Sequence, residues 1–443
     1  MTDVTFKELA RLSAAERAAL VRRSETDLSY FLEHAAPIIA EVRANGDTAL
    51  ARFGRDLDKA KGLAPDNLKA TEAEFAHAFD LVDQAVIEAI DYGIENIRSF
   101  HREQLPEPMW LKEVRPGAFA GDRFTPISSV ALYVPRGKGA FPSVTMMTAV
   151  PGVVAGVPDL AILTPPGPDG GVDAATLVAA RLAGVDTVYK CGGAQAVAAA
   201  AFGTETVRKA KKILGPGSPW VVAAKRLLSD VIDPGLPAGP SEVVILADET
   251  VHGGLAALDL LIEAEHGPDS SAWLVTPSRR VVDEALAALP RHWAQMSEQR
   301  AGFSRAVLTG RAGGIILAAS MADACAFVNE YAPEHLEILS THPFDYLGEI
   351  TEAAEILLGT RTPNAIANYV LGPNAVLPTS MGANTHGPLS VSDFMRRSSV
   401  GYVTAKGYPQ LAAHTRTLAE YEGFSSHANA VGPMRDPYLE GQH

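Results

Sequence analysis

Cysteine is nearly absent from this chain of 443 residues, which contains only Cys191 and Cys325. Two cysteines so far apart exclude a disulfide framework and a thiolate metal cluster, and they fit a reducing, cytoplasmic setting. Positive charge is also scarce, because 38 Lys and Arg stand against 52 Asp and Glu, a formal net charge of −14. So acidic a chain disfavours nucleic acid or an anionic membrane as the main partner and favours a small molecule or a protein.

Long hydrophobic runs are missing as well. Residues 1–20 carry charges throughout and lack the apolar core of a signal peptide. The nearly uncharged segment 144–166 is divided by Pro151, Pro158 and two glycines, so we interpret it as a buried helix followed by a buried strand. Hydrophobic residues make up 47% of the chain and charged residues 20%, which is the balance of a soluble globular protein.

Alternating short strands and Ala-rich helices dominate the chain from residue 129 onward. The first hundred residues are mostly helical in pattern, with a capping box at Ser13 and Glu16 and a predicted helix stop at Asn45 and Gly46. Strands are predicted at 130–134, 160–164, 187–190, 213–214, 243–247, 272–275 and 314–317. This alternation predicts an α/β fold with parallel sheet, in which the ligand crevice lies at the carboxyl ends of the strands. The last fifty residues are polar and helical.

A carboxylate and an imidazole lie three residues apart at Glu263 and His266, at the end of an apolar helix that begins near Gly254. Residues at this spacing share a helix face, and the pair is half of a zinc site. The alternative is an ordinary fraying helix end that is capped by Gly267.

A second acid and imidazole pair, Glu334 and His335, follows a predicted helix. His335 suits a general base, because an unperturbed imidazole titrates near neutral pH, and Glu334 could orient or activate a water. A loop with ordinary polar residues is the alternative. Glu422 and His427 lie in the polar tail, where isolated histidines are usually solvated. No G-x-G-x-x-G follows any strand, so the standard dinucleotide fingerprint is missing.

Taken in order, eight segments of the chain resemble histidinol dehydrogenase. They are ALYVP at 131–135, GGAQA at 192–196, GPG at 215–217, AGPSEV at 238–243, AEHGPD at 264–269, YAPEHL at 331–336, LGPNAVLPT at 371–379 and EGFSSH at 422–427. The resemblance implies two incomplete Rossmann-like domains in an intertwined homodimer. Its expected parts are a helical N-terminal arm (1–30), a first Rossmann-like domain with the metal and catalytic residues (31–132 and 242–380), a second that binds NAD (133–241), and a C-terminal dimerisation tail (381–443).

The resemblance also implies which residues act. NAD contacts are expected from Tyr133, Gln195 and Ser218, although the family usually has Asn at the last position. Substrate contacts are expected from Ser241, His335 and Glu422 together with the metal ligands. His335 would remove the hydroxyl proton while hydride passes to NAD. Glu334 would help to activate water for a second oxidation, from the aldehyde level to the carboxylate.

The expected metal ligands depart from the family pattern. The family has Gln, His, Asp and His, the last from the other subunit, and this chain has Glu263, His266, Asn368 and His427 at those positions. One substitution adds a negative charge and another removes one, so the ligand set keeps a charge of −1 and remains all nitrogen and oxygen. We expect such a site to hold zinc, with manganese as an alternative.

Other departures concern the pocket. Ala375 stands where the family typically has a substrate-contacting His, and losing that hydrogen bond should weaken histidinol binding unless another group replaces it. His386 is either that replacement or a surface residue. Arg136 and Lys138 follow a strand, where they either hold an anion or point into solvent.

We therefore hypothesise a metal-dependent, NAD-linked dehydrogenase that oxidises a small polar primary alcohol other than histidinol, with active sites shared between two subunits. The first alternative is histidinol dehydrogenase proper, which converts L-histidinol to L-histidine. The second is a non-catalytic homologue that keeps the fold for ligand sensing.

Overall fold

The computed structural model describes residues 4–21, 28–136 and 139–439. Two compact units divide the chain, one made of Met1–Leu105 and Ile127–Phe394 and the other of Pro106–Pro126 and Met395–His443. Two parallel sheets lie in the first unit, and the second unit holds an antiparallel ribbon and the C-terminal helices. None of the described helices is both long and apolar enough to cross a membrane.

A six-stranded parallel sheet forms one half of the first unit, in the order β1-β10-β9-β8-β11-β12. The strands are β1 (Phe6–Glu8), β8 (Glu242–Ala247), β9 (Ser271–Thr276), β10 (Gly313–Leu317), β11 (His335–Leu339) and β12 (Glu355–Leu358). One face packs against α9 (Gly253–Ala264), α10 (Arg279–Trp293) and α11 (Glu298–Leu308), and the other against α1 (Ala14–Val21), α12 (Met321–Tyr331) and α13 (Phe344–Leu347). Every residue of β8, β9 and β11 is buried, as expected for strands covered on both faces.

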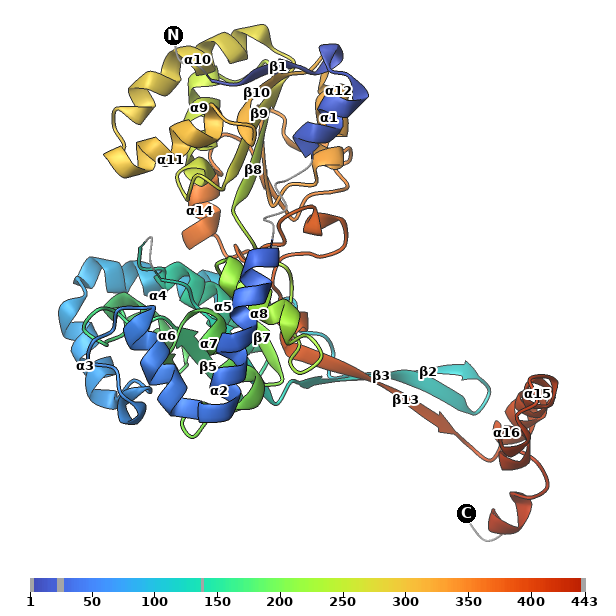
Figure 1. Ribbon diagram of the computed structural model, residues 1–443. Helices are drawn as coiled ribbons and strands as arrows, with labels where there is room; N and C mark the ends of the chain where they lie inside the picture. Colours follow the sequence, from blue (N-terminus) through green and yellow to red (C-terminus); the bar gives the residue numbers. More distant parts are fainter. Residues whose placement is uncertain (1–3, 22–27, 137–138, 440–443) are drawn as a thin grey trace. The chain divides into compact units, whose positions relative to one another are not determined.

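The start of the chain differs from the helical arm that we expected for residues 1–30. The capping box is confirmed, because Glu16 Oε2 accepts a hydrogen bond from the Ser13 backbone N–H at 2.8 Å. Phe6–Glu8, however, form the edge strand β1, which pairs in parallel with β10 (Figure 1). A strand of three residues has too short a pattern to be recognised in the sequence.

A four-stranded parallel sheet forms the other half of the first unit, in the order β6-β5-β4-β7. Its strands are β4 (Ser129–Tyr133), β5 (Asp159–Thr164), β6 (Val188–Lys190) and β7 (Lys212–Leu214), and they alternate with α5 (Pro142–Val154), α6 (Ala174–Ala183), α7 (Gly193–Phe202) and α8 (Pro219–Leu227). The chain runs outward from β4 to β6 and then returns to the far side of β4 for β7. The topological switch point therefore lies between β4 and β7.

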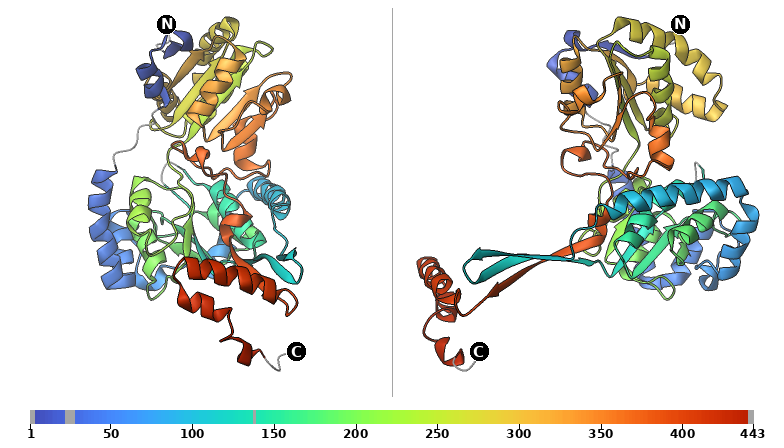
Figure 2. Two further views of the ribbon diagram at one scale, coloured as in Figure 1. Left: turned by 90° about the vertical axis from the view of Figure 1, so that its right-hand side faces the viewer. Right: turned by 180° about the vertical axis from the view of Figure 1, so that it is seen from behind.

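The helices before residue 105 are α2 (Ser29–Asp56), α3 (Glu72–Leu81) and α4 (Gln84–Arg102). The apolar face of α2 shares one core with α7 and α8, as Figure 2 shows for the blue and green helices. We had expected residues 31–132 to belong with residues 242–380 instead. The Ala-rich α7 is buried along almost its whole length, because α2 packs against the side of α7 that faces away from the sheet. The remaining domain boundaries stay predictions. Gly46, with φ of 45°, interrupts α2 at the predicted stop, and the helix then resumes.

The second unit is an antiparallel ribbon in the order β13-β3-β2, followed by two helices. Its elements are β2 (Met109–Arg115), β3 (Ala118–Pro126), β13 (Met395–Val403), α15 (Tyr408–Tyr421) and α16 (Ser425–Ala430) (Figure 2). All seven residues of β2 are exposed. The predicted polar, helical tail is therefore present, but a nine-residue strand precedes its helices.

The α/β class and both parallel sheets agree with the sequence prediction. All seven predicted strands are present, each within one or two residues of its expected ends. The segment expected to be a buried helix followed by a buried strand consists of α5 and β5.

Candidate active site

Charged residues gather at the amino ends of three neighbouring strands of the six-stranded sheet. Glu242, His335 and Glu355 are the first residues of β8, β11 and β12, and His335 pairs in register with Glu355. We had expected the crevice at carboxyl ends, so this part of the site lies at the opposite end of its sheet. Ala332, with φ of 48°, ends α12 and turns the chain toward Glu334 and His335.

His335 is held in one orientation by a buried carboxylate. Its Nδ1 lies 2.7 Å from Glu355 Oε2, and its Nε2 lies 4.0 Å from Glu334 Oε1. Glu334 is fixed in turn, because its Oε2 accepts a hydrogen bond from the Glu242 backbone N–H at 2.8 Å. All of these side chains are buried. The pair recognised in the sequence is therefore brought together, and Nε2 is the ring nitrogen that faces Glu334.

The pKa values in this cluster are strongly shifted. Burial by itself lowers the pKa of His335, but the negative charges of Glu263, Glu355 and Glu334 outweigh it and raise the pKa to about 10. Burial raises the pKa of Glu334 well above 4.5, although the nearby His335 opposes this rise. Without a bound cation, the surrounding carboxylates therefore favour the protonated form of His335, and burial favours the acid form of Glu334.

Three of the four predicted metal ligands converge on one another. Asn368, on α14 (Asn364–Tyr369), donates a hydrogen bond from Nδ2 to Glu263 Oε1 at 2.7 Å, and His266 Nδ1 lies 3.1 Å from Glu263 Oε2. Burial raises the pKa of Glu263, but His266, His335, Asn368 and Ser241 together lower it below 4.5. Glu263 is therefore a buried, ionised carboxylate.

This donor set fits a divalent cation, because a carboxylate, an imidazole and an amide oxygen can all coordinate one. Within the described residues, no three His, Cys, Asp or Glu side chains are arranged to hold a metal. The third donor here is instead the side-chain amide of Asn368.

The other predicted substrate residues are divided between the two units. Ser241 immediately precedes β8, and its hydroxyl hydrogen-bonds to Glu263. Glu422 is the C-cap of α15 and His427 lies on α16, and both are exposed in the second unit. Their contribution to the cluster stays a prediction.

The predicted cofactor residues lie at the carboxyl ends of the four-stranded sheet. Tyr133 ends β4, and its hydroxyl accepts a hydrogen bond from the Gly193 backbone N–H at 3.0 Å. Gln195, in the first turn of α7, donates from Nε2 to Asp58 Oδ2 at 3.3 Å, and Ser218 is the N-cap of α8. Asp58 was not recognised in the sequence, and burial raises its pKa to about 6.

The glycine turn after β7 packs its backbone closely against the backbone of Tyr133. Gly215 has φ of +111°, and a Cβ there would lie 2.1 Å from the Tyr133 carbonyl oxygen. Lys225, a buried residue of α8 that we did not predict, donates from Nζ to the Gly215 carbonyl at 2.9 Å. Burial lowers the pKa of Lys225 to about 8. No local motif marked this lysine, because its partner is a backbone carbonyl.

Of the remaining pocket candidates, two are half-buried, one is exposed and one lies outside the described residues. Arg136 is half-buried, with its guanidinium beside Gly167 in the loop after β5, and Lys138 lies outside the described residues. His386 is exposed, and its Nδ1 lies 2.9 Å from Thr385 Oγ1. Ala375 is half-buried.

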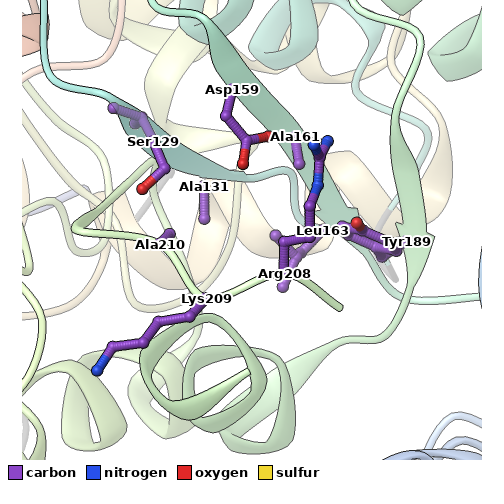
Figure 3. Close-up of a pocket in the computed structure, with 10 residues that line it drawn as sticks. Ser129, Ala131, Asp159, Ala161, Leu163, Tyr189, Arg208, Lys209 and Ala210 are labelled. Atoms are coloured by element: carbon purple, nitrogen blue, oxygen red, sulfur yellow. Dashed lines mark ion pairs between the residues drawn. The ribbon is translucent and has the colours of Figure 1, made fainter. Parts of the chain in front are cut away.

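A small pocket opens at the amino ends of β4 and β5 (Figure 3). It is lined by residues that include Ser129, Asp159 and Lys209, and Arg208 forms an ion pair with Asp159 at 2.8 Å. Its lining extends along the sheet to Leu163 but contains none of the predicted site residues.

Comparisons with known proteins agree with the sequence motifs. The model of the family described as histidinol dehydrogenase matches residues 21–434. A histidinol dehydrogenase homolog from Cereibacter sphaeroides is 73% identical over 99% of this chain and 100% of its own length. A histidinol dehydrogenase from Synechocystis is 47% identical over 96% of this chain and 97% of its own. The crystal structure of histidinol dehydrogenase from Elizabethkingia anophelis has a TM-score of 0.93, with 29% identity and 100% of both chains covered.

The two sheets and the imidazole and carboxylate cluster are thus those of an α/β oxidoreductase. The chain belongs to the histidinol dehydrogenase family, as the sequence motifs predicted.

One expectation is overturned by these comparisons. We hypothesised a substrate other than histidinol, whereas the matching family model, the Synechocystis relative and the solved structure all carry the name histidinol dehydrogenase. Our main hypothesis about the substrate is therefore wrong, and the alternative fits better. The substitutions at residues 263, 368 and 375 do not outweigh a resemblance that extends over the whole chain.

The turn after β7 gives a test of the cofactor end of the site. Replacing Gly215 by Ala should lower the melting temperature and weaken NAD binding by at least tenfold, because the new Cβ would push against the Tyr133 carbonyl. Both quantities can be measured by thermal unfolding and by NAD titration. Gly302→Ala is the matched control, since nothing lies within 4 Å of a Cβ there. Equal behaviour of the two variants would contradict a tightly constrained turn.

Proposed function

We propose that this protein oxidises L-histidinol to L-histidine with NAD as the electron acceptor. The observation that carries the proposal is the fixed geometry of His335, whose Nδ1 is held by Glu355 while Nε2 faces Glu334. Further support comes from the names of the family and of its matched members.

His335 acts as the general base in this proposal. An imidazole that donates from Nδ1 to Glu355 keeps the lone pair of Nε2 free to accept the hydroxyl proton. The base must be neutral, whereas the surrounding carboxylates raise the pKa of His335. Of these carboxylates, Glu263 raises the pKa of His335 most, and a cation beside Glu263 would offset its charge. Glu334, whose Oε1 faces Nε2, is placed to hold a proton and to orient water in the second oxidation.

Residues of this chain fit both bound groups. Glu263, His266 and Asn368 would hold the metal ion, zinc or manganese, with His427 as the proposed fourth ligand. The metal would polarise the substrate oxygen and NAD would accept hydride. Tyr133, Gln195 and Ser218 would contact NAD beside the glycine turn, where a Cβ at Gly217 would lie 2.5 Å from Val221 Cβ.

A homodimer with shared active sites forms part of the same proposal. Apolar side chains are exposed on β2 and on the C-terminal helices, among them Trp110, Leu418 and Tyr421. A three-stranded ribbon with so much exposed apolar surface is better suited to packing against another chain than to standing in water. Glu422 and His427 belong to the same unit.

Histidinol oxidation can be tested directly. We expect the purified protein to reduce NAD with L-histidinol, and His335→Ala to lower kcat by about 10²- to 10⁴-fold, because the proton acceptor is lost. His77→Ala, an exposed histidine on α3, is the control and should leave kcat unchanged. The proposal fails if the wild type with added zinc or manganese forms no NADH from histidinol.

Metal binding can be measured without turnover. The wild type should carry about one zinc or manganese ion per chain, and Glu263→Ala should reduce this below about 0.2, because it removes the buried charge of the site. Glu265→Gln alters a carboxylate two residues away and should bind as the wild type does. Equal metal content in Glu263→Ala and the wild type would contradict the assignment.

Shared active sites predict complementation between inactive variants. His335→Ala and His427→Ala homodimers should each be inactive, since each lacks one residue at both sites. Subunits exchanged between them should recover activity, because one of the two sites in a mixed dimer then has both histidines. If mixing restores nothing while labelled subunits are shown to exchange, His427 does not act across the dimer.

A further inference from the structure

Behind the metal and substrate cluster lies a second row of polar residues that has no assigned role. The first row consists of Glu263 on α9, Asn368 on α14 and His335 on β11. The second consists of Asp259, Asn364 and Glu337, one step along each of the same three elements. The spacing of four residues on each helix and two on the strand places each pair on one face. The second row therefore repeats the first in having one polar residue on each of α9, α14 and β11.

The second row is almost closed to solvent. Asp259 is 4% exposed, and Asn364 and Glu337 are 0% exposed. Ten buried side-chain atoms of the described residues lack a hydrogen-bond partner, and five of them belong to Glu337, Asn364 and Glu355. Buried polar atoms are normally satisfied, so such a concentration needs a physical cause.

A proton shared with Asp259 accounts for the unpaired carboxyl oxygens of Glu337, whereas the unpaired atoms of Asn364 and Glu355 have no explanation in it. The carboxyl group of Glu337 faces that of Asp259, within hydrogen-bonding reach. Two ionised carboxylates are both acceptors and repel each other, so a bond between them requires that one be protonated. A cation held by Asp259, Glu337 and the Asn364 amide is the competing explanation, and the variants below distinguish it from a shared proton.

The surroundings agree with a proton held on Glu337. Burial, together with the charge and the hydrogen bond of Asp259, raises the pKa of Glu337 to about 10, and the nearby Asn364 backbone amide only partly offsets this. Burial also raises the pKa of Asp259. Two titratable groups act on Glu337, namely Asp259 from α9 and Glu355 from β12. Beyond Glu355 lies His335 from β11.

Glu355 connects the two rows. Its Oε2 lies 2.7 Å from His335 Nδ1, and its buried Oε1 has no partner among the described residues. Its charge also acts on Glu337. If Asp259 and Glu337 share a proton, one negative charge fewer lies beside Glu355, whose Oε2 contacts His335 Nδ1.

We propose that Glu355 is a positioning residue for the base His335, and that Asp259 and Glu337, in the row behind it, hold one shared proton. Glu355 selects the tautomer of His335 whose Nε2 can accept a proton from the substrate. The statement about His335 rests on the proposed function, whereas the shared proton does not.

The shared proton is tested by stability alone. Glu337→Gln should fold with a melting temperature close to that of the wild type, because the amide donates to Asp259 as the protonated acid does. Glu337→Leu should melt well below both, since it leaves Asp259 buried without a donor. If Glu337→Gln melts as low as Glu337→Leu, or if either variant loses a bound metal ion that the wild type carries, the shared proton is wrong and a cation site takes its place.

The pH dependence of melting provides a second readout. A folded pKa of about 10 against 4.5 in the unfolded chain means that unfolding releases a proton between these values. The stabilisation is complete below pH 4.5 and declines as pH rises toward 10, so the wild type should lose melting temperature between pH 6 and pH 9. Glu337→Gln has no such proton, so its melting temperature should fall less between pH 6 and pH 9. If the melting temperatures of the wild type and Glu337→Gln fall equally with pH, the shared proton is overturned.

The positioning role is tested by kinetics with histidinol and NAD. Glu355→Leu should lower kcat by on the order of 100-fold with KM for NAD unchanged, because His335 loses its fixed tautomer. Glu355→Gln keeps an acceptor oxygen for Nδ1 and should recover about tenfold of that loss. Glu349→Gln, an exposed carboxylate before β12, is the control.

Two results separate the possible failures. Equal kcat in Glu355→Leu and Glu355→Gln, in a wild type that oxidises histidinol, would overturn the positioning role alone. A wild type that is inactive with histidinol would overturn the proposed function, and the two melting experiments would still decide on the shared proton.

Discussion

The buried negative charge of Glu263 is the constraint on which the candidate site depends. One carboxylate accepts a hydrogen bond from Asn368, contacts His266 and acts on His335, so it links α9, α14 and β11. A charge that is 1% exposed is costly unless donors and counter-charges surround it. The same groups that stabilise this charge are those that a metal ion would require. Under the proposed function, fold stability and metal affinity would therefore depend on one network.

This network also bears on the exchange of residue types at the expected metal ligands. By the resemblance, the family has an amide at residue 263 and a carboxylate at residue 368, and this chain has the reverse. In this chain Asn368 donates to Glu263 across the two helices, so the amide and the carboxylate contact each other. The charge moves from α14 to α9, and the total stays the same. We first interpreted the exchange as a sign of another substrate, but an exchange that keeps both the charge and the donor types does not by itself require one.

The predictable parts of the fold were those with long, uniform patterns. Apolar strands flanked by Ala-rich helices were found from β4 to β10, and the pairs at residues 263 and 266 and at 334 and 335 were recognised from spacing. The strands β1, β2, β3, β11, β12 and β13 were missed. Two of the three residues of β1 are charged, β11 has Glu337 at its centre, and β12 has only three apolar residues after Glu355. The ribbon strands β2, β3 and β13 have no long continuous apolar run. Asp58, Lys225 and Glu355 were missed for another reason. Each acts through a partner that is either distant in sequence or a backbone carbonyl, and a partner of either kind leaves no local motif in the sequence.

The placement of carboxylates at strand starts has a physical reason that sequence patterns do not reveal. At the amino end of a parallel sheet, the first N–H groups lack a ladder partner and need an acceptor. Glu334 Oε2 accepts from the Glu242 N–H, and Glu242 Oε1 accepts from the Ser380 N–H at 3.0 Å. Glu334 therefore caps the amino end of β8, and Glu242 ties the loop at Ser380 to the same end of the sheet. The carboxylates buried by these contacts surround His335, so the charges of the candidate site follow from how this end of the sheet is closed.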